Sequence, residues 1–452
     1  MAPRIHKLLV ANRGEIAVRI IRAAHELGME TVAAHSSADR DSLAVRLADE
    51  AVEIGPPHAS KSYLDAQAIL RAARQTGADS VHPGYGFLSE NAEFARAVEE
   101  AGLVFVGPTP EAIRTMGNKS LARETARRAG VPVVPGSDGV VPDIGRALAI
   151  AGEIGFPMMI KASAGGGGRG IRVARDAREL AHEFAVAQAE ARAAFGDPGV
   201  YLERFVGRAR HVEVQVLGDG RDVVHLYERE CSLQRRRQKI LEEAPSPALA
   251  PETRERLCRS ATTLARAVAY RGAGTLEYLY DAITGEFLFI EMNTRIQVEH
   301  PITEMITGVD LVRAMLRIAG GEPLPVRQEE IVARGAALEC RINAEDVSRD
   351  FMPCPGTVAD LFLPGGPGVR VDTLLYPGYR IPPFYDSLLA KLVVWAESRP
   401  AAIARMRQAL RELHIDGVPT TVGLHRDLMR SEEIRGGDYD TNTLERWVET
   451  RP

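Results

Sequence analysis

The stretch from residue 275 to residue 300 constrains the fold of this chain more than any other segment. It contains two β-rich runs joined by a short glycine-containing turn, a pattern typical of a β-hairpin. If the turn is centred on Thr284, Glu277 lies directly opposite Glu291 on one face, with Cβ atoms about 5 Å apart. Two opposed carboxylates repel each other unless a cation or a shared proton lies between them.

The same face of this hairpin offers further oxygen ligands. Asn293 points to it as well, roughly 7 Å further along the strand. A few oxygen ligands with room for water and phosphate suit Mg²⁺ or Mn²⁺. The prediction depends on the register, because a slip of one residue would place the two glutamates on opposite faces. A solvated hairpin with surface acids is the alternative. Against it, ionisable and amide side chains follow the strand closely: Arg295, Gln297, Glu299 and His300.

Charge and cysteine content exclude several classes of protein. The 452 residues carry a formal net charge of −5 and no basic tail, which argues against a nucleic-acid-binding protein. The four cysteines have no C-x-x-C spacing, so neither a zinc site nor a disulfide framework is indicated. No apolar run could span a bilayer, and the N-terminus lacks a signal core. We therefore expect a reduced, cytoplasmic protein with no membrane partner.

Strands and helices alternate along the first hundred residues. The sequence predicts a strand at 5–11, an amphipathic helix at 15–27 and a second strand at 31–35, which together form a βαβ unit. The turn of this unit lacks G-x-G-x-x-G, so we reject a nicotinamide site. Prolines 108 and 110 indicate a boundary, and a second one follows near 323–325. The chain is therefore predicted to have an α/β fold with two or three domains.

A run of glycines forms the second informative motif. A short strand, 158–161, is followed by Gly165, Gly166, Gly167 and Gly168 and then by another short strand. Consecutive glycines leave backbone N–H groups free to bind an anion, and Lys161 can reach the same phosphates. A flexible surface hairpin is the alternative, but flexible linkers usually mix Ser with Gly. The motif predicts a mobile phosphate-covering loop, although Gly-Lys-Ser/Thr of a Walker A loop is missing.

These segments together resemble the biotin carboxylase family of the ATP-grasp superfamily, over nearly the whole chain. The match includes Ala-Asn-Arg-Gly-Glu-Ile-Ala at 11–17, His-Pro-Gly-Tyr-Gly-Phe-Leu-Ser-Glu-Asn at 82–91 and the glycine run. It continues through the basic segment at 234–239, the highly specific Glu-Met-Asn-Thr-Arg-Ile-Gln-Val-Glu-His-Pro at 291–301, and Glu-Cys-Arg-Ile-Asn-Ala-Glu at 339–345.

The resemblance implies both a fold and a reaction. Residues 1–115 would form a Rossmann-like domain, residues 116–320 an ATP-grasp domain with a mobile lid at about 133–205, and residues 335–447 the C-terminal domain. The fold class is then α/β with α+β elements. ATP would phosphorylate bicarbonate to carboxyphosphate, which releases CO₂ beside biotin. The cofactors would be ATP and Mg²⁺ or Mn²⁺, in two ions, with biotin as the substrate.

The resemblance also assigns roles to individual residues. The metal ligands would be Glu277, Glu291 and Asn293, in agreement with the hairpin geometry. The catalytic residues would be Lys239, Arg295, Glu299 and Arg341, with Glu299 as the base and Arg341 steadying the enolate-like biotin. Bicarbonate would be bound by Lys239, Arg295, Gln297, Val298 and Glu299. Biotin would contact Tyr85 and Arg341. The ATP contacts would be Lys119, Lys161, Gly165–Gly168, Glu203, Val206, His211, Gln234, Arg237, Glu277 and Glu291.

Two positions depart from the family pattern. Arg237 stands where His is usual, so a titratable side chain is replaced by one that is always charged. Ala164 stands where Gly is usual, which could stiffen the lid. A catalytically weak or silent, ATP-binding regulatory paralogue is therefore one alternative function. An ATP-grasp ligase for another carboxylate is a second, and the block 295–299 together with Arg341 counts against it.

The sequence also predicts partners. No Ala-Met-Lys-Met segment of the kind that carries covalent biotin is present, so we expect biotin to arrive on a separate biotin carboxyl carrier protein. Carboxyltransferase subunits would complete an acyl-CoA carboxylase, and acetyl-CoA is the acceptor we expect. The resemblance suggests a homodimer.

Overall fold

A parallel sheet forms from the first hundred residues, as the alternation of strands and helices predicts. Its five strands have the order β3-β2-β1-β4-β5. They are β1 (Lys7–Val10), β2 (Glu30–Ser36), β3 (Glu50–Gly55), β4 (Ser80–His82) and β5 (Val104–Phe105). The helices are α1 (Gly14–Glu26), α2 (Leu43–Leu47), α3 (Ala66–Thr76) and α4 (Ala92–Glu100). The sequence prediction missed α2 and β3. The computed structural model describes residues 5–162 and 171–450.

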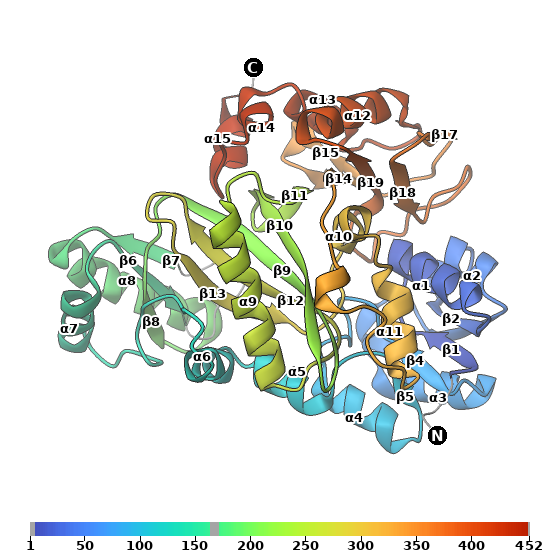
Figure 1. Ribbon diagram of the computed structural model, residues 1–452, viewed down its shortest axis with the longest axis horizontal. Coiled ribbons are helices and arrows are strands. Elements are labelled where there is room, and N and C mark those ends of the chain that lie inside the picture. Colours follow the sequence, from blue (N-terminus) through green and yellow to red (C-terminus); the bar gives the residue numbers. More distant parts are fainter. Residues whose placement is uncertain (1–4, 163–170, 451–452) are drawn as a thin grey trace.

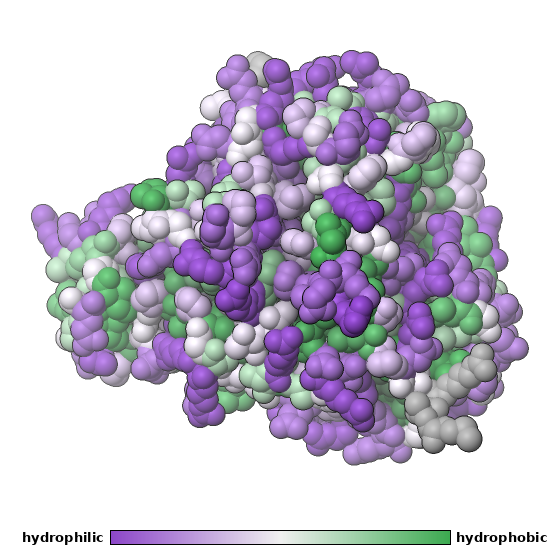
Figure 2. Space-filling view, viewed as in Figure 1, coloured by the Kyte–Doolittle hydropathy of each residue, from purple (hydrophilic) through white to green (hydrophobic). Residues whose placement is uncertain are grey.

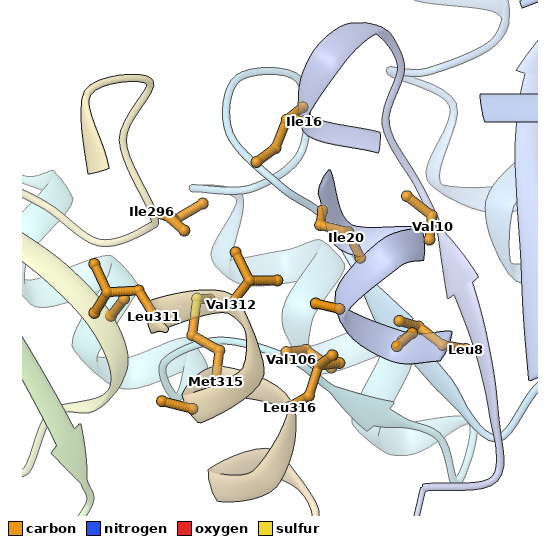
Figure 3. Packing of buried hydrophobic residues seen from close by; sticks show 14 of the residues in the cluster. Leu8, Val10, Ile16, Ile20, Val106, Ile296, Leu311, Val312, Met315 and Leu316 are labelled. Atoms are coloured by element: carbon orange, nitrogen blue, oxygen red, sulfur yellow. The ribbon is translucent and has the colours of Figure 1, made fainter. Parts of the chain in front are cut away.

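Helix α1 joins this first lobe to the centre of the molecule. Its apolar stripe includes Ile16 and Ile20, which are fully buried. They share one hydrophobic cluster with Leu311 and Met315 of α11 (Leu311–Ala319), and Figure 3 shows these side chains gathered between the two helices. The N-terminal lobe therefore packs directly on the central lobe.

The central feature is an antiparallel sheet of eight strands in the order β13-β12-β9-β10-β11-β14-β19-β18 (Figure 1). Its strands are β9 (Ala209–Asp219), β10 (Val223–Arg235), β11 (Gln238–Ala244), β12 (Arg271–Asp281), β13 (Phe287–Asn293), β14 (Ala336–Asn343), β18 (Val369–Thr373) and β19 (Leu388–Ala396). Because β11 pairs with β14, one sheet runs from the central lobe into the C-terminal lobe.

Helices cover both faces of this sheet. Helix α9 (Pro251–Ala267) packs on one face of β9 and β10, against Val212, Val214 and Val216, and α10 (His300–Thr307) lies on the other face, over β10, β11, β14 and β19. On the opposite face of β14 and β19 lies α12 (Arg399–Glu412). Strand β14 consequently directs Ala337 toward Ile302 of α10, and Leu338 toward Met406 of α12. The remaining C-terminal helices are α13 (Val422–Leu428), α14 (Glu432–Gly436) and α15 (Thr443–Glu449).

A small lobe projects from the rest of the molecule, at the left of Figure 1. It has a three-stranded antiparallel sheet in the order β7-β6-β8. Its elements are α7 (Ile144–Ile154), β6 (Met158–Ala162), β7 (Ile171–Ala174), α8 (Ala177–Phe195) and β8 (Val200–Arg204), and it follows α5 (Pro110–Gly117) and α6 (Lys119–Arg128). The predicted phosphate loop, Gly165–Gly168, lies outside the described residues.

Short two-stranded pairs complete the C-terminal lobe: β15 (Glu345–Asp346) with β16 (Met352–Pro353), and β17 (Leu361–Phe362) with β20 (His414–Ile415). The face shown in Figure 2 is mostly hydrophilic, and its hydrophobic residues form small separate groups. Among the described residues, none of the helices combines the length and the apolar character needed to cross a membrane.

Candidate active site

A cavity of about 480 Å³ brings together residues from four distant parts of the chain. It lies over one face of the eight-stranded sheet, where β9 to β14 meet the segment that follows β13. Thirteen of the residues predicted from the sequence line it: Tyr85, His211, Gln234, Arg237, Lys239, Glu277, Glu291, Asn293, Arg295, Gln297, Val298, Glu299 and Arg341. The sequence motifs therefore converge on one place.

A β-bulge sets the orientation of the hairpin carboxylates. Glu277 pairs with Glu291, as predicted, but the neighbouring pair is Tyr278 with Phe289, so Ile290 is the extra residue. The turn is therefore not centred on Thr284, which the sequence reasoning had assumed. Without the extra residue, Glu291 would share a face with Phe289, which lies in the hydrophobic core. The bulge directs Glu291 and Asn293 to the cavity and leaves Phe289 in the core.

A row of charged side chains crosses four adjacent strands. Glu291 of β13 lies beside Glu277 of β12, which lies beside Glu213 of β9, and Glu213 pairs in turn with Arg229 of β10. Glu213 and Arg229 are fully buried, and Arg229 Nε donates to Glu213 Oε1 at 2.6 Å. Three carboxylates and one guanidinium in a row carry net negative charge, so further cations must approach from above the sheet.

Lys239 is one of these cations. Its Nζ lies 2.5 Å from Glu213 Oε2, 3.2 Å from Glu277 Oε1 and 2.5 Å from Glu299 Oε1. Burial alone would lower the pKa of Lys239, but the three carboxylates raise it well above its usual range. The side chain is therefore a fixed positive charge at neutral pH.

Glu299 lies between two cations. In addition to Lys239, Arg341 Nη2 donates to Glu299 Oε2 at 2.9 Å. Burial would raise the pKa of Glu299, but Lys239 and Arg341 hold it well below its usual range. Glu299 is consequently an ionised carboxylate whose proton affinity depends on how strongly these two cations contact it.

The residues around Glu299 are fixed by hydrogen bonds. Gln297 donates to Glu277 Oε1 at 2.9 Å and accepts from Arg229 at 3.2 Å. The Val298 carbonyl accepts from buried Lys391 at 2.9 Å. Arg295 donates to Glu90 at 2.8 Å and to Asn293 Oδ1 at 2.9 Å. The segment thus presents amide, guanidinium and carboxylate groups in a fixed arrangement.

The predicted metal ligands suit a divalent cation. Glu291 makes no hydrogen bond or salt bridge with any residue in the described part of the chain. Burial and the neighbouring Glu277 carboxylate raise its pKa. Asn293 adds an amide group and donates to Glu277 Oε1 at 2.9 Å. A partly buried carboxylate with no hydrogen-bond or ion-pair partner among the described residues, opposite a second carboxylate, is a donor set that fits Mg²⁺ or Mn²⁺.

Two other groups of side chains could geometrically hold a metal: His211, Glu213 and Glu277, and Glu213, Cys231 and Glu299. Lys239 contacts Glu213, Glu277 and Glu299 directly, so at least two members of each group are already neutralised by an ammonium. A divalent cation there would meet electrostatic repulsion at short range. The face with Glu291 is therefore the better cation site.

Two further predicted residues contact one another at the rim. His211 Nε2 lies 3.0 Å from Glu277 Oε2, and Gln234 Nε2 lies 2.7 Å from His211 Nδ1. Burial alone would lower the pKa of His211, but Glu277 raises it. Arg237 lies at the β10–β11 turn, where both Arg236 and Arg237 have positive φ, 48° and 66°.

Four predicted residues lie outside the cavity. Lys161 and Glu203 form a salt bridge with each other between β6 and β8 of the small lobe. Lys119 is exposed at the first position of α6. Val206 is buried in a small hydrophobic cluster with Val134 and Leu288. These residues belong to or adjoin the projecting lobe, so the cavity contains one part of the predicted ATP contacts.

Sequence reasoning missed several residues of the site. Gln238, Asn343, Asp386, Ser387 and Leu388 line the cavity, and Glu15 accepts from Tyr85 at 2.6 Å beneath it. For Glu213 a signal was available: in His-Val-Glu-Val-Gln-Val, strict alternation places it on the same face as His211. No such signal marks the loop 386–388, because the chain returns to the site through tertiary packing.

Comparison with known proteins gives three family matches along the chain. Residues 4–113 match the family described as biotin carboxylase, N-terminal domain, and residues 339–446 the biotin carboxylase C-terminal domain. Residues 118–327 match the carbamoyl-phosphate synthase L chain, ATP binding domain.

Similar proteins agree with these matches. "Biotin carboxylase 1" of Bacillus subtilis is 53% identical over 442 residues, covering 98% of each chain. The biotin carboxylase domain dimer of Hydrogenobacter thermophilus 2-oxoglutarate carboxylase, solved with MgADP, ADP and bicarbonate, has a TM-score of 0.90 at 48% identity and covers 99% of each chain. A Campylobacter jejuni biotin carboxylase in complex with β-γ-ATP has a TM-score of 0.91 at 46% identity, over 98% of this chain and 99% of that one.

Proposed function

Because this chain belongs to the biotin carboxylase family, we propose how its residues carry out the ATP- and bicarbonate-dependent carboxylation of biotin. The enzyme is an ATP-dependent carbon–nitrogen ligase of the ATP-grasp type. The observation that supports the residue roles best is the position of Glu299, whose carboxylate contacts both Lys239 and Arg341.

Bicarbonate enters as an anion and competes with the Glu299 carboxylate for the cations around it. Arg295, Lys239, Gln297 and the Val298 backbone would hold it. When Lys239 turns to bicarbonate, Glu299 loses part of the field that lowers its pKa, so it becomes a stronger base. Glu299 then accepts the bicarbonate proton while the oxygen attacks the terminal phosphate of ATP, which forms carboxyphosphate and ADP.

Biotin is carboxylated in the second half of the reaction. Carboxyphosphate breaks into CO₂ and phosphate beside the ureido ring, and the ring N–H proton passes to the released phosphate as the strongest adjacent base. Arg341 stabilises the enolate-like ring until its nitrogen bonds to CO₂. Tyr85 lines the same cavity and would contact the biotin ring.

Glu277, Glu291 and Asn293 would hold the divalent cations, which supply positive charge against the phosphates of ATP. Lys119, Lys161, Glu203, Val206, His211, Gln234 and Arg237, with the glycine loop, would bind the nucleotide. The salt bridge between Lys161 and Glu203 holds the lysine at the edge of the small lobe, from which it could contact phosphate when the lobe approaches.

We further propose that biotin is presented on a separate carrier protein and that the enzyme works as a homodimer beside carboxyltransferase subunits. The match to the Bacillus biotin carboxylase over 98% of each chain supports biotin carboxylation as the half-reaction of this chain. The Hydrogenobacter neighbour is a dimer. The four cysteines are free, three of them fully buried, in keeping with a cytoplasmic location.

The decisive test measures ADP release by the purified chain with Mg²⁺ and free biotin, with and without bicarbonate. Turnover that requires both bicarbonate and biotin is the expected result. Tight ATP binding without such turnover, even with a biotinylated carrier protein, would contradict the proposed catalytic roles.

A further inference from the structure

Two buried glutamates lie directly behind Arg341. Glu242 of β11 and Glu339 of β14 pair across the ladder, so both side chains point to the same face of the sheet. Both are 0% exposed. Their face is the one covered by the first turn of α10, because Ala337, two residues from Glu339, packs on Ile302 there.

Among the residues that the structure describes, three of the four oxygen atoms of this pair have no hydrogen-bond partner. Glu242 Oε1 accepts from Arg341 Nε at 2.6 Å. Glu242 Oε2 and both oxygens of Glu339 make no hydrogen bond with any group in the described residues. Ionised carboxylates can only accept, so two opposed ones could not satisfy each other, whereas an acid and a carboxylate can.

Charge distribution identifies the member of the pair that should be neutral. The other buried carboxylates nearby each contact a cation: Glu213 and Glu277 contact Lys239, and Glu242 and Glu299 contact Arg341. No salt bridge reaches Glu339 from any residue that the structure describes. An isolated ionised carboxylate in this position would be very costly.

The charged groups around the pair agree with this assignment. Burial and the Glu242 charge raise the pKa of Glu339 well above its usual range, against the lowering effect of Lys391 and Arg341. Burial raises the pKa of Glu242 to about 7. The titratable groups that interact with the pair come from several adjoining elements: Cys231 of β10, Lys239 of β11, Arg341 of β14, Lys391 of β19 and Glu299 before α10.

We propose that Glu339 is a neutral carboxylic acid that donates a hydrogen bond to Glu242, and that this pair is a positioning device for Arg341. The inference rests on the proposed role of Arg341 at biotin. Glu242 Oε1 accepts from Nε of Arg341 and lies 2.6 Å from its Nη2, which also donates to Glu299 at the cavity. Because Glu339 is neutral, one negative charge fewer opposes the entry of bicarbonate.

Infrared spectroscopy tests the protonation state directly. The wild-type protein at neutral pH is expected to show the carbonyl stretch of a buried protonated carboxyl group, and Glu339→Gln is expected to lose it. The matched control is Glu243→Gln, since Glu243 is buried next to Glu242 on β11 but contacts Arg399 and Tyr439 on the opposite face. No loss of carbonyl intensity in Glu339→Gln relative to wild type, or no band in wild type, would overturn the proposal.

Kinetics test the positioning role. An amide resembles a neutral acid, so Glu339→Gln should keep near-wild-type kcat at neutral pH. The wild-type KM for bicarbonate should rise at alkaline pH as Glu339 ionises, and the variant should lack that rise. Glu242→Gln should lower biotin-dependent kcat roughly 10- to 100-fold with the KM for ATP unchanged, and the Glu339 band should shift in frequency. Unchanged kcat and an unshifted band in this variant would contradict the pairing.

These outcomes are separable from the proposed function. If the wild-type protein shows no bicarbonate-dependent turnover, the function fails while the infrared result still decides the state of Glu339. If turnover is present and the band is absent, the function stands and the present inference fails.

Discussion

At the scale of single residues, the chemistry depends on how Lys239 is shared. One ammonium contacts three carboxylates that come from β9, β12 and the segment before α10. No one of these contacts is exclusive, so an entering anion can replace one carboxylate while the other two still contact the ammonium. The same sharing explains why Glu299 is a weak base in the free enzyme and a stronger one with bicarbonate bound.

Replacement of Glu299 by glutamine tests the base directly. The amide cannot take up a proton but keeps the size of the side chain, so bicarbonate-dependent ADP release should fall by about 10²- to 10⁴-fold. ATP binding, measured by calorimetry, should persist because Glu299 is not among the predicted nucleotide contacts. Retention of more than a tenth of the turnover would assign the base to another group.

Arg237 provides a second prediction at this scale. The family pattern has histidine at this position, and an arginine is always charged. If Arg237 contacts the phosphates of ATP, Arg237→His should make the KM for ATP depend on pH near 6.5, rising as the imidazole loses its proton. The wild-type KM should change less in that range, because only the variant carries the additional imidazole. Identical pH dependence in both proteins would show that residue 237 does not contact the nucleotide.

At the scale of elements, irregularities in strands place the functional side chains. The bulge at Ile290 reverses the faces of β13, and the tight β10–β11 turn brings Arg237, Gln238 and Lys239 to the cavity rim. Both central residues of that turn have positive φ, a conformation that Asn and Gly adopt more easily than Arg. The turn therefore keeps strained residues where the site needs charge.

The strain predicts a stabilising substitution. Arg236 is exposed and contacts Asp350 at 2.7 Å on the surface, where an ion pair contributes little. Arg236→Asn should relieve backbone strain and leave the free energy of unfolding unchanged or increased by up to about 1 kcal/mol. Urea denaturation measures the change, with Arg237→Asn as the control that also alters the KM for ATP. If Arg236→Asn is clearly less stable than wild type, the contact with Asp350 contributes more to stability than the backbone strain at residue 236 costs.

Strand pairing also shows which parts of the site could be predicted from the sequence. The pairing of Glu277 with Glu291 was predictable, because hairpin pattern and charge repulsion both constrain it. The bulge was not predictable, since a hairpin with a symmetrical turn and no bulge also pairs Glu277 with Glu291. The opposition of Glu242 and Glu339 was beyond prediction as well: nearly a hundred residues separate them, and the register of β11 with β14 depends on packing across two lobes. Local patterns predicted the strands, while tertiary assembly decided their neighbours.

At the scale of the whole molecule, buried histidines make stability depend on pH. Burial lowers the pKa of His82 to about 3 and that of His425 to about 4. Both values lie below the usual 6.5, so as pH falls from 6.5 the unfolded chain binds protons that the folded chain does not. Stability is therefore lost on acidification, by about 1.4 kcal/mol per pH unit for each histidine until its folded pKa is reached.

A variant isolates one of these histidines. His82→Asn keeps an acceptor for the Gly84 N–H, which now donates to His82 Nδ1 at 3.0 Å. Its free energy of unfolding should fall less steeply than that of wild type between pH 6.5 and 4, in denaturant titrations at several pH values. His182→Asn, at a side chain 76% exposed, should leave the slope unchanged. Equal slopes for wild type and His82→Asn would show that His82 is protonated in the folded state.

The pairing of β11 with β14 also has a practical consequence. A protein engineer who divides the chain between its ATP-binding part and its C-terminal part would cut through one continuous sheet. Each half would then expose a strand edge with unpaired N–H and C=O groups, which invites aggregation. Expressed together, the halves would offer each other the missing edge, so this enzyme is better suited to fragment complementation than to dissection into autonomous modules.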